Sequence, residues 1–136
     1  MSRLIQKQTA FTIGDKVKLG DYILTVNEVA PCVSSNQFDV PQSGHRFVTI
    51  DVTQENTGTE PRSYNVWDFK VQDDKDFAYQ TAISTCKQPS FRSGTLQNGE
   101  KTRGYITFEL PVDNEPVKAI FSPSWWSSDQ IIINLQ

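Results

Sequence analysis

Residues of common catalytic and metal sites are scarce in this sequence. The chain has one histidine, His45, and two cysteines, Cys32 and Cys86. Nucleophilic triads and most zinc sites need a histidine beside a nucleophile or several ligands together. Neither a G-x-S-x-G nor an H-E-x-x-H motif occurs. We therefore predict a protein that is not an enzyme and needs no metal or cofactor, with His45 in a surface role.

Long apolar runs and an excess of basic residues are also missing. No stretch is long enough to span a bilayer, so no transmembrane segment is expected. The net charge is -3, and phosphate binding needs a basic face, so the sequence argues against a nucleic-acid partner. The first ten residues, MSRLIQKQTA, lack the apolar region of a signal peptide. This predicts either a cytoplasmic protein or one that begins after a removed leader.

What the chain does contain indicates one globular domain. Its 136 residues are 37% hydrophobic and 21% charged, which is enough to bury a core and too apolar for a disordered chain. We assign residues 1–10 to a lead-in or cloning remnant and residues 11–136 to a single domain.

The stretch from Gly44 to Phe69 organises the prediction. Apolar residues at 48, 50 and 52 alternate with polar ones, which is typical of a half-buried strand. Asn56-Thr57-Gly58 should end that strand in a turn. A second strand is expected where Trp67, Phe69 and Val71 alternate with polar residues.

Similar patterns continue on both sides of this stretch. The register breaks at Asn27-Glu28, which predicts a β-bulge that returns Val29 to the core. Residues 31–44 are expected to form a long surface loop. Asn98-Gly99 predicts a hairpin turn, because both residues accept positive φ.

Together these segments predict seven to nine short strands and no convincing helix. That pattern is typical of a two-layer antiparallel β-sandwich. We expect the following side chains to be buried between the layers: Val48, Ile50, Val52, Trp67, Phe69, Ile106, Phe108 and Leu110.

Four segments in this order resemble a known family: FTIGDKVKLGDYILTVNEV, GHRFVTIDVTQENTGTEP, WDFKVQDDKDFAY and SGTLQNGEKTRGYITFELP. The order is similar to that of a bacterial domain of unknown function with an immunoglobulin-like fold, related to the mycobacterial immunoprotective extracellular protein. The resemblance covers about residues 11–135. It implies an immunoglobulin-like sandwich and a secreted or cell-surface location, with no catalytic residues to carry over.

The two cysteines are compatible either with one disulfide or with two free thiols. The resemblance points to an oxidising compartment, and it therefore favours a disulfide between Cys32 and Cys86.

Two further clusters are candidate sites. Asp73, Asp74 and Asp76 could offer oxygens to calcium, but Lys75 lies among them, and a solvated hairpin turn is the preferred interpretation. Trp125-Trp126 lies in a loop by composition, and an adjacent pair in extended backbone tends to point at least one ring outward. Packing over the end of the sandwich would explain the same pair.

The function predicted from these features is an extracellular or cell-surface binding or adhesion module. Its ligand would be a protein or a glycan, and its binding surface would centre on Trp125 and Trp126, extended by Tyr105. The alternatives are a structural accessory domain that self-associates through sheet edges, forming a homodimer, and a hydrolase on the same fold.

Overall fold

The computed structural model describes residues 11–123 and 129–136. Within these ranges the chain forms eleven strands and one 3₁₀ turn. In chain order the elements are β1 (Phe11–Thr12), β2 (Val17–Leu19), β3 (Tyr22–Cys32), β4 (His45–Asn56), β5 (Arg62–Tyr64), η2 (Val66–Asp68), β6 (Phe69–Asp73), β7 (Ala78–Gln80), β8 (Gly94–Leu96), β9 (Lys101–Pro111), β10 (Pro116–Phe121) and β11 (Ile131–Asn134).

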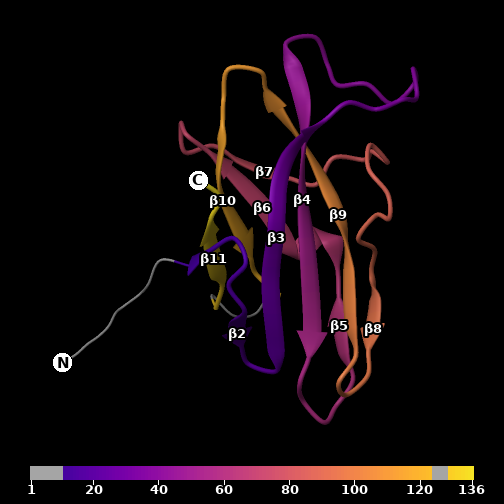
Figure 1. The fold of residues 1–136 in the computed structure, drawn as a ribbon, viewed down its shortest axis with the longest axis vertical. Coiled ribbons are helices and arrows are strands. Elements are labelled where there is room, and N and C mark those ends of the chain that lie inside the picture. Colours follow the sequence, from indigo (N-terminus) through magenta and orange to yellow (C-terminus); the bar gives the residue numbers. More distant parts are fainter. Residues whose placement is uncertain (1–10, 124–128) are drawn as a thin grey trace, which may run out of the picture.

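The strands form two main sheets, which overlap in the view of Figure 1. One has the order β1-β11-β10-β6-β7 and the other has the order β2-β3-β4-β9, while β5 and β8 form a small separate pair. Neighbouring strands are antiparallel except for β1, which pairs with β11 in parallel. The predicted antiparallel sandwich is confirmed, with more strands than expected because several are only two or three residues long.

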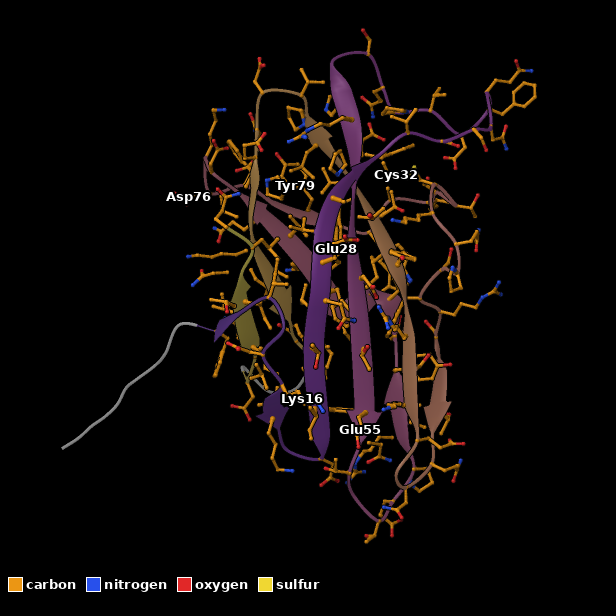
Figure 2. The ribbon with its side chains drawn as sticks, in the orientation of Figure 1. Lys16, Glu28, Cys32, Glu55, Asp76 and Tyr79 are labelled. Carbon is orange, nitrogen blue, oxygen red and sulfur yellow. A yellow bond between two sulfur atoms is a disulfide. The ribbon has the colours of Figure 1, made fainter. Side chains whose placement is uncertain are left out.

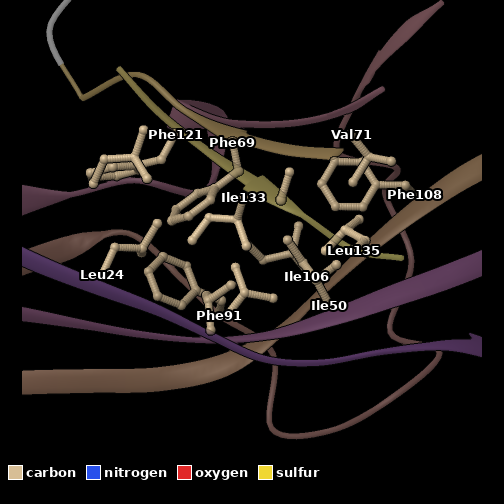
Figure 3. Close-up of a cluster of buried hydrophobic side chains, with 14 of the residues drawn as sticks. Leu24, Ile50, Phe69, Val71, Phe91, Ile106, Phe108, Phe121, Ile133 and Leu135 are labelled. Carbon is tan, nitrogen blue, oxygen red and sulfur yellow. The ribbon is translucent and has the colours of Figure 1, made fainter. Parts of the chain in front are cut away.

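The core lies between the two main sheets (Figure 3). Alternate residues of β3, β4 and β9 point inward and meet the inward residues of β6, β10 and β11. Three rings meet at the centre: Phe69 lies 5.0 Å from Phe121 and 5.3 Å from Phe91, measured between ring centroids. Phe91 comes from the loop between β7 and β8, so this loop is fastened into the core.

The predicted bulge and central strand are confirmed. The β3–β4 register shifts between Val26 and Glu28, and Val29 beyond the shift packs against the core. Val48, Ile50 and Val52 are buried, and β4 ends at Asn56 as the Asn-Thr-Gly signal predicted.

The predicted hairpin at Asn98-Gly99 is wrong. The turn exists, since Glu100 N donates to the Gln97 carbonyl at 3.0 Å, but β8 pairs with β5 whereas β9 pairs with β4. Gly99 has a φ of +81°; Asn98 is not among the described residues with positive φ. A two-residue type I′ hairpin would need positive φ at both central positions. Because β8 and β9 pair with different strands, the turn instead links two sheets.

The predicted loop beginning at Pro31 is also too long, because β3 continues to Cys32. The part of β3 that ends at Cys32 pairs with β4 on one side only, since β2 pairs with residues 22–24 alone. Proline is tolerated on such an open edge because no ladder donor is needed there.

Gln54 on β4 is fully buried, and its side-chain nitrogen and oxygen find no hydrogen-bond partner among the described residues. An unsatisfied buried amide destabilises the native state. We expect Gln54→Met to raise the free energy of unfolding by about 1–2 kcal/mol, because it keeps much of the volume and removes the unpaired polar atoms. Urea denaturation measures this.

Asn56 provides the matched control, because it is a second buried amide on the same face of the same strand. Its side chain donates to the carbonyls of Glu60 and Leu96 at 2.8 and 2.9 Å and accepts from Gly58 N at 2.9 Å. Asn56→Leu should therefore destabilise the fold. A loss of stability in Gln54→Met would mean that Gln54 has a polar partner in solution.

Candidate functional site

A groove of about 270 Å³ lies beside the edge strand β9. Three segments that are distant in the sequence form it: the turn η2, the loop after β7, and the middle of β9. Its described lining consists of Val66, Trp67, Thr81, Ala82, Ile83, Ser84, Thr85, Ser90, Phe91, Tyr105, Ile106 and Thr107. None of these side chains carries a charge, so the groove suits an uncharged, mainly apolar group.

The wall of the groove is fixed by backbone hydrogen bonds along β9. Ala82 N donates to the Thr107 carbonyl at 2.8 Å, and Phe91 N donates to the Tyr105 carbonyl at 2.9 Å. Tyr105 N in turn donates to the Pro89 carbonyl at 2.9 Å. The chain's own loop therefore occupies the β9 edge at these residues, and a ligand there would contact side chains instead of adding a strand.

Gly104 explains how closely this loop approaches β9. A Cβ atom at Gly104 would lie 2.5 Å from the backbone nitrogen of Phe91. Any larger residue would push the loop away from the strand and withdraw Phe91 from the core. Gly104 thus sets the depth of the groove wall.

Trp67 stands at the groove on the 3₁₀ turn. Asn65 caps the turn, since its Oδ1 accepts from Trp67 N at 3.0 Å and from Ser93 Oγ at 3.0 Å. The expectation that Trp67 is buried is wrong, because 53% of the residue is exposed. The period-2 pattern breaks here: η2 is a three-residue 3₁₀ turn, and the alternating strand begins only at Phe69.

Ile83 is the second apolar residue exposed at the groove, with 96% of its surface accessible. Sequence reasoning missed both Ile83 and Trp67 as site residues. The available signals were weak: Ile83 is an isolated apolar residue in a polar, irregular stretch, and Asn65 is a typical cap residue before a turn.

Of the predicted binding residues, the structure places Tyr105 in the groove lining. The Nζ atom of Lys87 lies 4.7 Å from the centre of its ring, a distance suited to a cation–π contact. Trp125 and Trp126 lie outside the described residues. Ser122, on the near side of that stretch, donates from its backbone N to the Asp68 carbonyl at 2.9 Å.

Asp68 brings a titratable group close to the Trp67 turn. Burial raises the pKa of its carboxyl to about 6, because the charged form loses solvation. The carboxyl therefore changes charge near pH 6, at the end of the turn that carries Trp67.

The interpretation of Asp73 as part of a solvated turn is wrong. Asp73 is fully buried, and Figure 2 shows its neighbours Asp76 and Tyr79 near one end of the sandwich. Its carboxylate accepts from Tyr79 Oη at 2.6 Å, Asn114 Nδ2 at 2.8 Å, Lys75 N at 2.9 Å and Phe77 N at 3.0 Å. Four donors use the acceptor capacity of a carboxylate, so Asp73 organises the turn between β6 and β7.

Other candidate groups have local structural roles. A ring nitrogen of His45 lies 3.3 Å from the Ser43 carbonyl. Arg103 forms two hydrogen bonds, of 3.1 and 2.8 Å, to the buried Asp51. Among residues 11–123 and 129–136, no three His, Cys, Asp or Glu side chains are grouped as a metal site would require.

The disulfide joins Cys32, at the end of β3, to Cys86 in the loop that forms the groove wall. Figure 2 shows Cys32 where β3 leaves the sandwich. The bond ties two segments that are 54 residues apart in the sequence. In the described part of the chain, no helix has the length and hydropathy needed to cross a bilayer.

Solved structures with this fold come from several bacteria. The YjhA protein of Bacillus subtilis superposes with a TM-score of 0.68 at 22% identity, covering 93% of this chain and 99% of the other. The secreted protein MPT63 of Mycobacterium tuberculosis gives 0.65 at 13% identity, covering 94% and 98%. A β-sandwich protein of Clostridium difficile gives 0.57 at 12% identity, covering 100% and 99%. These likenesses establish the shared fold.

Sequence comparison points the same way. The chain is 28% identical over 106 residues to the uncharacterized lipoprotein YjhA of Bacillus subtilis, a match that covers 76% of this chain. It spans about half, 47%, of the length of that relative. The family model of a domain of unknown function, DUF4352, matches residues 11–131. The chain therefore belongs to the DUF4352 family.

Proposed function

We propose that this protein is a non-enzymatic, extracellular or cell-surface binding module, and that the groove beside Trp67 holds part of its ligand. The observation that carries the proposal is Trp67 itself, a half-exposed ring next to the exposed Ile83. Large aromatic residues dominate the energetics of interfaces. Exposed apolar side chains that lie together favour a partner that covers them.

Two observations support the proposed extracellular or cell-surface location. The relatives include a lipoprotein and a secreted protein, and disulfides persist mainly in oxidising compartments outside the cytosol. The Cys32–Cys86 bond fits such a compartment.

The ligand is a protein or a glycan, and the groove favours a protein. Its described lining offers hydroxyl groups but neither carboxylate nor carboxamide side chains. Several of these hydroxyls are already engaged: Thr81 Oγ1 donates to the Thr107 carbonyl at 3.2 Å, and Ser84 Oγ donates to Asp39 at 3.0 Å. An apolar side chain of a partner would fit this lining better than the many hydroxyls of a sugar. Trp125-Trp126 remains a proposed part of the binding surface.

The hydrolase alternative has less support. Catalysis by a nucleophile needs a base within hydrogen-bond reach. The ring of His45, the one histidine of the sequence, contacts a backbone carbonyl.

The test begins with peptide and glycan arrays probed with the labelled protein, followed by calorimetry on any ligand found. We expect Trp67→Ala to weaken binding by about 30-fold, as for a central interface aromatic. Because Trp67 is half exposed, the free energy of unfolding should change by less than about 1 kcal/mol.

Phe77→Ala is the matched control, since Phe77 is also an exposed aromatic but lies in the Asp73 turn, outside the groove. It should leave affinity unchanged. If Trp67→Ala binds normally while Trp125→Ala or Trp126→Ala does not, the groove is not the ligand site.

A further inference from the structure

The loop between β3 and β4 forms a projecting arm, here defined as residues 33–44. Figure 1 shows it leaving the end of the sandwich and extending away from the sheets. Three of its apolar residues, Val33, Phe38 and Val40, are exposed, and Phe38 has 87% of its surface accessible. Exposed apolar side chains that lie together on a surface favour a partner that covers them.

Contacts with the rest of the chain hold the arm in place. The Cys32–Cys86 disulfide fixes one end, and at the other end Val112 N donates to the Gly44 carbonyl at 2.9 Å. In the middle, Asp39 Oδ2 accepts from Ser84 Oγ and from Thr85 N, both at 3.0 Å. Phe38 is therefore presented from an anchored segment, which lowers the entropy lost when it docks.

The Asp39–Ser84 hydrogen bond also places the arm next to the groove. Phe38 precedes Asp39, and Ile83 precedes Ser84 in the groove wall. A projecting apolar ring and an apolar hollow thus lie on either side of one contact. The arm and the groove wall thus form one continuous surface at this contact.

The charges of the two features are compatible. The arm carries a single formal charge, Asp39, which is already hydrogen-bonded, and the described groove lining carries none. Burying one against the other leaves neither of them with an unpaired charge, and the Lys87 ammonium group beside the groove keeps its contact with the Tyr105 ring. A groove of about 270 Å³ is below the usual range for whole ligands and suits a single side chain.

We propose that two copies of this chain dock through this face, with Phe38 of each copy entering the groove of the other beside Trp67 and Ile83. In a two-fold dimer the same patch is used by both subunits. A projection and a hollow that are neighbours on one patch can then fill each other twice. The proposal uses the same groove as the proposed function, so the second copy and an outside ligand compete for it.

The first experiment measures the oligomeric state by analytical ultracentrifugation between about 1 µM and 1 mM, the range of weak to moderate complexes. We expect a concentration-dependent monomer–dimer equilibrium. Phe38→Ser and Ile83→Glu should each raise the dimer dissociation constant by at least about 30-fold, as expected for hot-spot residues. Both side chains are exposed in the single chain, so circular dichroism and the unfolding midpoint should stay unchanged; Phe77→Ser serves as the surface control.

A complementation experiment tests the reciprocal geometry. Phe38→Ser keeps the groove and loses the ring, whereas Ile83→Glu keeps the ring and blocks the groove. Neither variant alone can form either contact, but a mixture can form one of the two. The mixed dimer should therefore be tighter than both homodimers.

Three results would overturn the proposal: a monomer at every concentration, a dimer that Phe38→Ser leaves intact, or no gain on mixing the two variants. None of them removes the proposed function, which rests on ligand affinity and on Trp67→Ala. If the protein is monomeric and Phe38→Ser weakens binding of an array ligand, the arm belongs to the ligand site instead.

Discussion

Replacing both Cys32 and Cys86 by serine should lower the free energy of unfolding by about 4 kcal/mol, on the chain-entropy account of disulfides. The two residues are 54 positions apart, and a cross-link over that distance removes many conformations from the unfolded chain. The expected loss is a large fraction of the stability of an ordinary domain. Urea denaturation of the oxidised wild type and of the double variant measures it.

Chemical reduction gives an independent control. Reduced wild type should match the double variant in unfolding midpoint, and the oxidised protein should show no free thiol when titrated in denaturant without reductant. Two titratable thiols, or a stability loss below about 1 kcal/mol, would show that the bond does not restrain the unfolded chain as the loop-entropy account requires.

The second large effect is expected at Asp73. Replacing it by alanine removes the acceptor for Tyr79 Oη, Asn114 Nδ2 and two backbone N–H groups at once. Buried donors left unpaired are destabilising, and hydrogen bonds to a charged acceptor are stronger than neutral ones. Asp73→Ala should therefore lower the free energy of unfolding by about 3 kcal/mol. Thermal or urea unfolding at neutral pH measures the loss.

The pH dependence of this effect follows from the pKa of Asp73. Burial opposes the charged carboxylate, but the hydrogen bonds from Tyr79, Asn114 and the backbone outweigh burial and lower the pKa below its ordinary value. A lowered native pKa gives stability that is fully present above the unfolded pKa, about 3.9, and is lost as the pH falls through the native value. The difference in free energy of unfolding between wild type and Asp73→Ala should therefore become smaller below about pH 4.

Asp76→Asn is the control for this second prediction. Asp76 lies in the same turn, is exposed and has a φ of +70°, a conformation that asparagine also tolerates. This variant removes one negative charge without touching the buried network, and its stability should change little. An equal loss in both variants would assign the effect to the net charge of the turn.

The strands with one buried face were the most predictable part of the molecule. Val48, Ile50 and Val52 alternate with polar residues because β4 lies in the middle of its sheet, with its even-numbered side chains in the core. The bulge at Asn27-Glu28 was visible for the same reason, since it interrupts a period that is otherwise strict. Local patterns report local geometry well.

Features that depend on long-range contacts were not predictable in this way. Trp67 fits an alternating pattern in the sequence, but the 3₁₀ turn interrupts it and turns the ring outward. Asp73 looks like part of a charged turn, and its burial depends on Asn114, which is 41 residues away.

The groove was unpredictable for a related reason. Its wall forms only because residues 82–91 lie along β9 and close to Gly104. Tyr105 was identified as a binding residue without any signal for its neighbours Trp67 and Ile83. No window along the chain contains all three, so their meeting is a property of the sheet topology.

The parallel pairing of β1 with β11 has a mechanical consequence. Because Phe11 pairs with Ile133 and Thr12 with Asn134 in the same direction, a force that pulls residue 11 and residue 134 apart acts along both strands. Such a load shears the ladder, so its hydrogen bonds resist together instead of opening one after another. If the domain is tethered on one side of β1 and loaded beyond β11, as when it links a surface to a partner, this short ladder is the first element to bear the tension.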